Sequence, residues 1–169
     1  DFDALADKYG LEKIKTIGDS YMVVSGVPQP RVDHAERVAF FALEAIDTMH
    51  RYNTIAAENA PPHSLLELRI GIHTGKVVAG VIGKKKFAYD LWGDTVNIAS
   101  RMESHGASGQ IHISDDVRLE LIKAQQQLNQ EPHKGSATTA MILPFQCVER
   151  GEIEVKGKGM MKTYFLQRA

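Results

Sequence analysis

Apolar and polar residues follow two different periods along the chain, and each period marks one kind of secondary structure. Apolar residues three or four positions apart predict helices over residues 1–9 and after three capping positions, Asp33, Asp94 and Ser114. Shorter runs rich in β-branched and aromatic residues predict strands, which span 11–17, 21–25, 65–73, 76–83, 87–92, 110–113, 145–155 and 162–166. Helices and strands mixed in this order predict one α+β domain over residues 1–169.

Two glycine-containing pairs predict tight turns between neighbouring strands. Gly18-Asp19 separates the first two predicted strands, so we expect a hairpin whose tip carries Asp19. Thr74-Gly75 separates the next two strands and predicts a second hairpin. Lys84–Lys86 is a short basic stretch that we interpret as a solvated turn.

Two stretches without apolar periodicity predict irregular structure. The first runs from Asn53 to Ser64 and contains Pro61-Pro62, so we expect a loop. The second, residues 125–139, is rich in Gln and then contains Pro, His, Lys, Gly, Ser and Thr. We expect this second stretch to be a mobile insertion.

Composition limits the kind of partner that the chain can bind. Its 169 residues carry a formal net charge of −1, which argues against nucleic acid as the main partner. Cys147 is the only cysteine, which excludes an internal disulfide and favours a reducing, cytoplasmic setting. No apolar run approaches the roughly 20 residues that span a bilayer. Because Asp1 lies within a predicted helix, we expect the chain to be part of a longer protein, which could still be attached to a membrane.

The strand over residues 87–92 contains a polar residue that packing alone would not place there. Asp90 interrupts an aromatic-rich run, and a buried aspartate costs several kcal/mol unless a donor meets it. Gly93-Asp94 then predicts a turn and the start of a helix. The strand therefore indicates a site as well as a core element.

The helix after Asp94 carries two kinds of side chain. Val96, Ala99 and Met102 have the spacing of a buried stripe. Asn97 and Arg101 are four residues apart, so they share a different face and can reach one ligand together. A helix start that contains several mediocre helix formers favours a functional site.

Four further polar residues have two interpretations from the residues alone. Asp19 is either an ordinary turn residue or a carboxylate that a hairpin tip presents to a hard cation. Lys15 and Arg69 are either solvated strand residues or ligand contacts, and composition alone favours the first. Lys156, between Val155 and Gly157, is either a turn lysine or a phosphate contact.

Three blocks of sequence, in this order, resemble the catalytic domain of the class III nucleotidyl cyclases, the adenylyl and guanylyl cyclases. The blocks are Lys13–Met22, Tyr89–Glu103 and Val155–Gly159, and the resemblance covers nearly the whole chain. It implies a ferredoxin-like α/β sandwich whose active site forms between two such domains. Such enzymes convert a nucleoside triphosphate into a 3′,5′-cyclic monophosphate and pyrophosphate, using two Mg²⁺ or Mn²⁺ ions.

The resemblance also implies a role for each candidate residue. Asp19 corresponds to a metal carboxylate, Asn97 to the residue that orients the ribose, and Arg101 to the residue that offsets charge on the α-phosphoryl group. Lys156 and Arg69 correspond to contacts with the β- and γ-phosphates. The reaction asks mainly for positioning and charge compensation, which these residue types supply.

Lys15 and Asp90 occupy the two base-reading positions that the resemblance implies. An amine donor facing N1 and a carboxylate accepting from the 6-amino group suit adenine, whereas guanine presents the opposite pattern. The pair therefore predicts an adenylyl cyclase that uses ATP. The alternatives are a guanylyl cyclase and a non-catalytic, nucleotide-binding regulatory module of the same type. A soluble α+β domain with incidental polar residues is the least specific interpretation.

The resemblance implies a homodimer, because one chain carries both groups of residues. Asp19 and Arg69 would serve one site, and Lys15, Asp90, Asn97, Arg101 and Lys156 would serve the other. The family also has an N-terminal strand with a first metal aspartate ahead of the helix that ends at Tyr9, and we expect this strand to be missing here. A regulatory domain of the same parent chain is the other expected partner.

Overall fold

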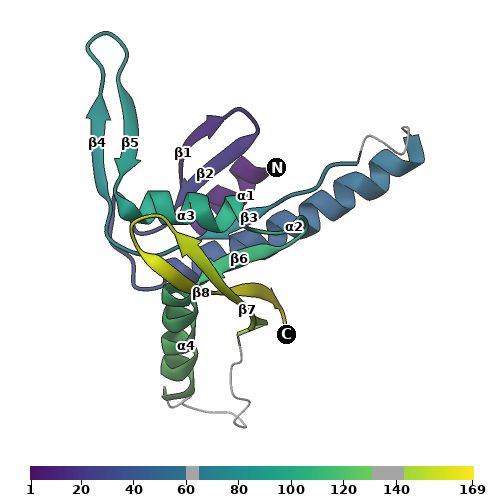
Figure 1. The fold of residues 1–169 in the computed structure, drawn as a ribbon. Helices are drawn as coiled ribbons and strands as arrows, with labels where there is room; N and C mark the ends of the chain where they lie inside the picture. Colours follow the sequence, from purple (N-terminus) through teal and green to yellow (C-terminus); the bar gives the residue numbers. More distant parts are fainter. Residues whose placement is uncertain (60–64, 131–142) are drawn as a thin grey trace, which may run out of the picture.

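The computed structural model describes residues 1–59, 65–130 and 143–169. Within these ranges, four helices and eight strands form a mixed α+β fold, as predicted (Figure 1). Its elements are α1 (Phe2–Tyr9), β1 (Glu12–Ile17), β2 (Ser20–Val24), α2 (His34–Asn59), β3 (Ile70–Ile72), β4 (Val78–Ile82), β5 (Ala88–Trp92), α3 (Asp94–Ser104), β6 (Ile111–Ser114), α4 (Asp115–Gln130), β7 (Phe145–Val155) and β8 (Gly159–Arg168). None of these helices combines the length and the apolar character that a membrane crossing requires.

The strands form one four-stranded sheet and two hairpins. The sheet has the order β3-β6-β8-β7, with β3 parallel to β6 and the other pairs antiparallel. β1 pairs with β2, and β4 pairs with β5, each as a separate two-stranded unit. The β4–β5 hairpin projects well beyond the body of the molecule (Figure 1).

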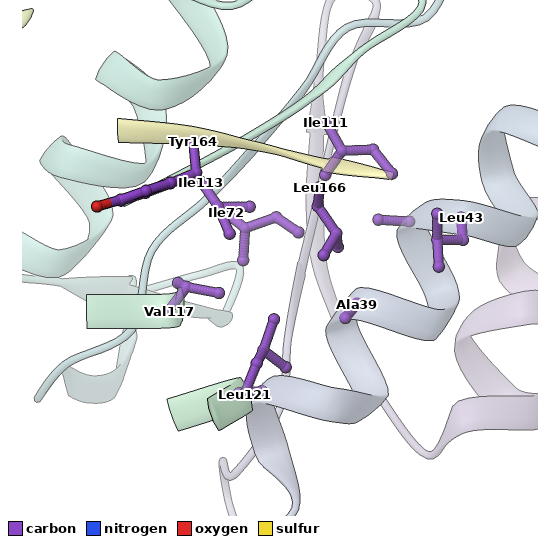
Figure 2. Packing of buried hydrophobic residues seen from close by; sticks show 11 residues of the cluster. Ala39, Leu43, Ile72, Ile111, Ile113, Val117, Leu121, Tyr164 and Leu166 are labelled. Atoms are coloured by element: carbon purple, nitrogen blue, oxygen red, sulfur yellow. The ribbon is translucent and has the colours of Figure 1, made fainter. Parts of the chain in front are cut away.

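The main core lies between the four-stranded sheet and the helices α2 and α4 (Figure 2). Successive side chains of a strand point to opposite faces, so Ile111 and Ile113 of β6 face this core while His112 between them faces α3. Full burial of one such aliphatic side chain contributes about 1.5–3 kcal/mol. The buried members are Ala35, Ala39, Ala42, Leu43, Ile72, Ile111, Ile113, Val117, Leu121, Tyr164 and Leu166.

Helix α3 covers the other face of the sheet and completes three layers. Its Ile98 and Met102 are buried against Ile153 and Val155 of β7. A separate cluster joins α1 and the β1–β2 hairpin to α2, and Gly10 ends α1 in the left-handed conformation at φ 63°. The helix that carries the candidate catalytic residues is thereby fixed against the sheet.

The predicted hairpin between residues 65–73 and 76–83 is wrong. β3 contains only Ile70–Ile72 and pairs with β6, while β4 pairs with β5. After β3 the chain follows the start of α3 instead of turning back, because the Thr95 hydroxyl donates to the Lys76 carbonyl oxygen at 2.6 Å. Gly75 permits this approach, since a Cβ atom there would lie 2.7 Å from the same hydroxyl. Lys84–Lys86 forms the exposed connection of the β4–β5 hairpin, as predicted for a solvated turn.

Two helices extend into stretches that the sequence predicts as irregular. Helix α2 continues through residues 53–59, where the Asn53 side chain donates to the Leu66 carbonyl oxygen and accepts from the Leu66 N–H. Helix α4 continues through residues 125–130, because Gln and Leu are good helix formers even without an apolar stripe. The remainder of the predicted loop, 60–64, and of the predicted insertion, 131–139, lies outside the described residues.

A groove of about 1400 Å³ separates the β1–β2 hairpin from the edge of the four-stranded sheet. Phe41, Ala42 and Ala45 of α2 line it, together with residues of β2 and β3. Within the described ranges, β2 pairs only with β1, and β3 pairs only with β6. Each of these two strands therefore has one unpaired edge, and both strands contribute to the groove wall.

Candidate active site

Asn97 and Arg101 lie on the exposed face of α3. Of the predicted inward stripe, Met102 is fully buried, but Val96 and Ala99 are only half-buried and line the groove. Ile98 is buried in their place, because it lies one turn before Met102 and faces β7. In the part of the chain that the structure describes, neither the Asn97 amide nor the Arg101 guanidinium has a hydrogen-bond or ion-pair partner. Both groups are available to a ligand.

Lys15 and Asp90 lie side by side, although 75 positions separate them in the sequence. The Lys15 ammonium donates to one Asp90 carboxylate oxygen at 2.6 Å, and the other oxygen accepts from the Leu91 N–H at 2.8 Å. These two donors lower the pKa of Asp90 below its usual range, the ammonium more than the amide. Asp90 is therefore ionised at neutral pH and forms an ion pair with the Lys15 ammonium.

A β-bulge in β1 lies directly before Lys15. The register with β2 shifts between Lys13 and Lys15, which leaves Ile14 as an extra residue. Lys13 donates to Asp3 of α1 at 2.8 Å, whereas Lys15 reaches β5. Residues two apart on a regular strand point the same way, so the bulge explains why these two lysines bind different elements.

Asp19 lies in the two-residue turn of the β1–β2 hairpin, which Ile17 and Ser20 close. Its side chain is exposed and lines the groove. Mg²⁺ is commonly held by one or two carboxylates together with substrate phosphates, so Asp19 fits one ligand position of such a site. No group of three or more His, Cys, Asp or Glu residues that could hold a metal ion occurs in the described ranges. The fit is thus to one carboxylate ligand and no more.

Arg69 lies just before β3 and is paired with α3. Its Nε donates to a Glu103 carboxylate oxygen at 2.7 Å, and Nη2 lies 2.7 Å from the same oxygen. Gly71 allows this close packing, because a Cβ atom there would lie 2.5 Å from the Glu103 Cα atom and closer still to its backbone nitrogen. Arg69 remains 44% exposed, so its guanidinium can also reach a ligand.

Lys156 is exposed in the turn between β7 and β8 and has no side-chain partner in the described residues. The neighbouring Lys158, which the sequence did not single out, binds Asp94 at the start of α3 at 2.9 Å. This contact lowers the pKa of Asp94. The turn that carries Lys156 is thereby tied to the helix that carries Asn97 and Arg101.

The candidate residues are thus arranged around α3, though not all in contact. Lys15 with Asp90 and Arg69 with Glu103 are brought together. Asp19 and Arg69 line the same groove but make no hydrogen bond or ion pair with each other within the described part of the chain. Sequence reasoning missed Lys158, which binds Asp94, and Glu103, which binds Arg69. Both residues belong to the sequence blocks quoted above, where an oppositely charged partner for each could have been sought.

Residues 1–168 match the family model described as the adenylate and guanylate cyclase catalytic domain. The chain belongs to this family. It is 47% identical over 165 residues to an adenylate cyclase of Mycobacterium tuberculosis, covering 98% of this chain and 31% of that protein. It is 46% identical over 166 residues to the guanylate cyclase soluble subunit beta-2 of Rattus norvegicus, covering 98% of this chain and 21% of that protein. The chain therefore spans less than a third of these relatives.

Solved structures of cyclase domains have the same fold. The catalytic core of a rhodopsin-guanylyl cyclase with converted specificity, in complex with ATPalphaS, is 35% identical with a TM-score of 0.75, covering 99% of this chain and 77% of that chain. The adenylyl cyclase CyaB from P. aeruginosa is 25% identical with a TM-score of 0.77, at the same coverage of 99% and 77%. The predicted α+β fold of the class III cyclase type is confirmed. Cyclases of both nucleotide classes are similar to this chain.

Proposed function

We propose that this cyclase domain is an adenylyl cyclase that converts ATP into 3′,5′-cyclic AMP and pyrophosphate. The observation that carries the choice of base is the contact between Lys15 and Asp90, at 2.6 Å. Adenine presents an acceptor at N1 and a donor at the 6-amino group, which match an ammonium donor and a carboxylate acceptor. Guanine presents a donor and an acceptor at these places and leaves both protein groups unmatched.

The chemistry follows from the exposed groups on α3. The 3′-oxygen of the ribose forms a bond to the α-phosphorus, the bond from that phosphorus to the pyrophosphate oxygen breaks in line, and the hydroxyl proton is released. Asn97 orients the ribose, and the planar Arg101 guanidinium binds the α-phosphoryl oxygens as charge develops on them. Arg69 and Lys156 bind the β- and γ-phosphates, which holds the leaving group in line.

We also propose that each complete active site binds two divalent cations, Mg²⁺ or Mn²⁺, with Asp19 as one ligand. Members of this family generally depend on such ions, and an exposed carboxylate is a suitable oxygen ligand. When bound, these ions lower the pKa of a coordinated hydroxyl group and offset phosphate charge. In the structure, the position of the Asp19 carboxylate at the groove supports this proposal.

A homodimer is the proposed active form, with a regulatory domain of the parent chain as a further partner. The β4–β5 hairpin supports the dimer, because it projects from the body of the molecule (Figure 1). It also exposes apolar side chains. Val78, Val81, Ile82 and Phe87 are 52–77% exposed. The single cysteine supports a cytoplasmic location for the catalytic domain.

A guanylyl cyclase is the second candidate, because guanylate cyclases are nearly as similar to this chain as adenylate cyclases. The experiment is to measure cyclic AMP from ATP and cyclic GMP from GTP with the same preparation. We expect kcat/KM to be at least about tenfold higher for ATP, the factor expected when a wrong base leaves buried polar groups unpaired. An equal or higher kcat/KM for GTP would favour the guanylyl cyclase instead. The absence of product from either nucleotide would favour a regulatory module.

The double variant Lys15→Glu with Asp90→Cys tests the residues that select the base. The swap replaces the ammonium donor with an acceptor and removes the carboxylate, so the preference should shift from ATP toward GTP. The ratio of the two kcat/KM values measures this shift. An unchanged ratio would mean that other residues select the base.

A further inference from the structure

His112 is a fully buried residue on the face of β6 that meets α3. Its Nδ1 lies 2.7 Å from the carbonyl oxygen of Met102, the residue next to Arg101. Met102 is itself 0% exposed. The last turn of the helix that carries Asn97 and Arg101 is therefore hydrogen-bonded to the central sheet by one side chain.

Arg150 determines which nitrogen of His112 carries the proton. Its guanidinium lies 3.4 Å from His112 Nε2, and arginine can only donate, so Nε2 is the acceptor. The neutral imidazole then carries its proton on Nδ1 and donates it to the Met102 carbonyl oxygen. The Phe165 ring packs against both groups, with centroid distances of 5.6 Å to the imidazole and 5.6 Å to the guanidinium carbon.

Local backbone features position Arg150 and α3 for this arrangement. The register between β7 and β8 shifts between Glu149 and Gly151, so Arg150 is the extra residue of a β-bulge. Bulges redirect side chains, and this one lies where Arg150 reaches His112. On β3, the strand that pairs with β6, Gly71 lets the backbone of Glu103 come close, and Arg69 donates to the Glu103 carboxylate at 2.7 Å. The end of α3 is thus contacted at two adjacent residues, 102 and 103.

We propose that His112 is a positioning residue of the cyclase reaction: its Nδ1–H holds the Met102 carbonyl oxygen and thereby sets where α3 presents Asn97 and Arg101. His112 does not touch the substrate. It acts through the rigid helix, since a displacement of about 1 Å in a group that contacts the transition state can cost up to about 100-fold in rate. This inference rests on the proposed roles of Asn97 and Arg101.

Two variants of His112 separate positioning from packing. His112→Leu fills the space but removes the donor, while the side-chain amide of His112→Asn can place a donor near the position of Nδ1. For His112→Leu we expect kcat to fall by about tenfold or more, with a change in KM of less than about twofold, because the loss falls on the transition state. His112→Asn should recover most of kcat.

Ser114→Ala is the matched control. Ser114 lies on the same strand, is 0% exposed and shares its hydroxyl with His73 Nδ1 at 2.7 Å. The variant removes a buried histidine hydrogen bond on the same face of β6, but neither partner of that bond belongs to α3. It should therefore lower the melting temperature while kcat stays near the wild-type value. A kcat loss in Ser114→Ala equal to that in His112→Leu would overturn the proposal, as would a normal kcat in folded His112→Leu.

A second measurement keeps this inference distinct from the proposed function. The His105 N–H bonds to the Arg101 carbonyl oxygen at 3.0 Å, at the end of α3. Its amide exchange should accelerate in His112→Leu and return toward the wild-type rate in His112→Asn. If the wild-type chain makes no cyclic nucleotide, the proposed function fails, but this exchange still shows whether His112 holds the helix. Unchanged exchange in His112→Leu would overturn the inference even in an active enzyme.

Discussion

The side chains of Asn97 and Arg101 contribute little to the stability of the fold but take a direct part in the proposed reaction. Neither side chain has a partner in the described ranges, and both lie on the exposed face of a helix whose other face is buried. Their removal should therefore leave the fold intact. Exposed residues away from structural contacts usually change stability by less than about 0.5 kcal/mol.

Asn97→Ala and Arg101→Ala should each lower kcat by about 100-fold or more, because the proposed roles of these residues are contacts made mainly in the transition state. Initial rates of cyclic AMP formation measure kcat, and thermal unfolding measures stability. We expect melting temperatures close to that of the wild-type protein. Near-normal rates in either folded variant would contradict the assigned role.

The residues of the site could be predicted from sequence where the chemistry is local to a short block. Asn97 and Arg101 are four apart on one helix, so their shared exposed face follows from helical geometry alone. Lys15 and Asp90 could be assigned to one base only through the family resemblance, and the structure adds that they touch. The pairing of Glu103 with Arg69 depends on the crossing of α3 and β3 at Gly71, which no local pattern indicates.

At the scale of elements, α3 is the part of the fold that joins the site to the core. It packs on β7 through Ile98 and Met102, approaches β3 at Gly71, and is tied through Asp94 to the β7–β8 turn. Its position is therefore set by contacts from three directions. A substitution that changes the packing of α3 should therefore shift the site residues, even if the substituted residue does not contact the substrate.

Gly71→Ala tests this dependence. The added methyl would overlap the backbone of Glu103, so α3 must move, and overpacking of this kind typically costs about 1–3 kcal/mol. We expect a lower melting temperature together with a kcat that is reduced by about tenfold or more. Gly80→Ala is the control, because its nearest neighbour is the end of the Trp92 ring at 3.3 Å. Equal stability losses in both variants would contradict the special role of Gly71.

Element boundaries could be predicted where a breaker residue marks them. Gly10 ends α1 and Gly18-Asp19 forms the first hairpin, as expected. The predicted hairpin across Thr74-Gly75 is wrong because the apolar run around β3 has two possible partners. The parallel pairing of β3 with β6 depends on residues about forty positions later, a separation that turn residues cannot encode. The ends of α2 and α4 were also misjudged, since helix formers without an apolar stripe still continue a helix.

At the scale of the whole molecule, buried histidines make the stability depend on pH. Burial lowers the pKa of His112 and of His73, so both stay neutral in the fold at pH values where the unfolded chain binds protons. The unfolded state then takes up more protons than the folded state as pH falls below about 6.5, and stability falls with it. The effect is at most about 1.4 kcal/mol per pH unit for each histidine.

The melting temperature should therefore be lower at pH 5.5 than at pH 7.5. This window lies above the pH at which the carboxylates with a lowered pKa, such as Asp90, begin to be protonated, so the two effects are separable. A melting temperature that is constant between these two pH values would contradict the prediction.

The proposed homodimer predicts complementation between inactive variants. Asp19→Ala and Asn97→Ala change residues that would serve opposite halves of one site. A mixed dimer would contain one site with both changes and one site with neither, so mixing the two inactive proteins should restore up to about half the activity per mixed dimer. Product formation as a function of mixing ratio measures this. If activity stays absent although the subunits exchange, each chain forms its site alone.

In the described part of the chain, the groove between β2 and β3 exposes the unpaired edges of two separate sheets. Each of these strands presents main-chain N–H and C=O groups on the side that no described strand covers. An extended peptide that paired with either edge would add one strand to that sheet. Strand addition at this place would therefore alter the architecture of the domain as well as its surface.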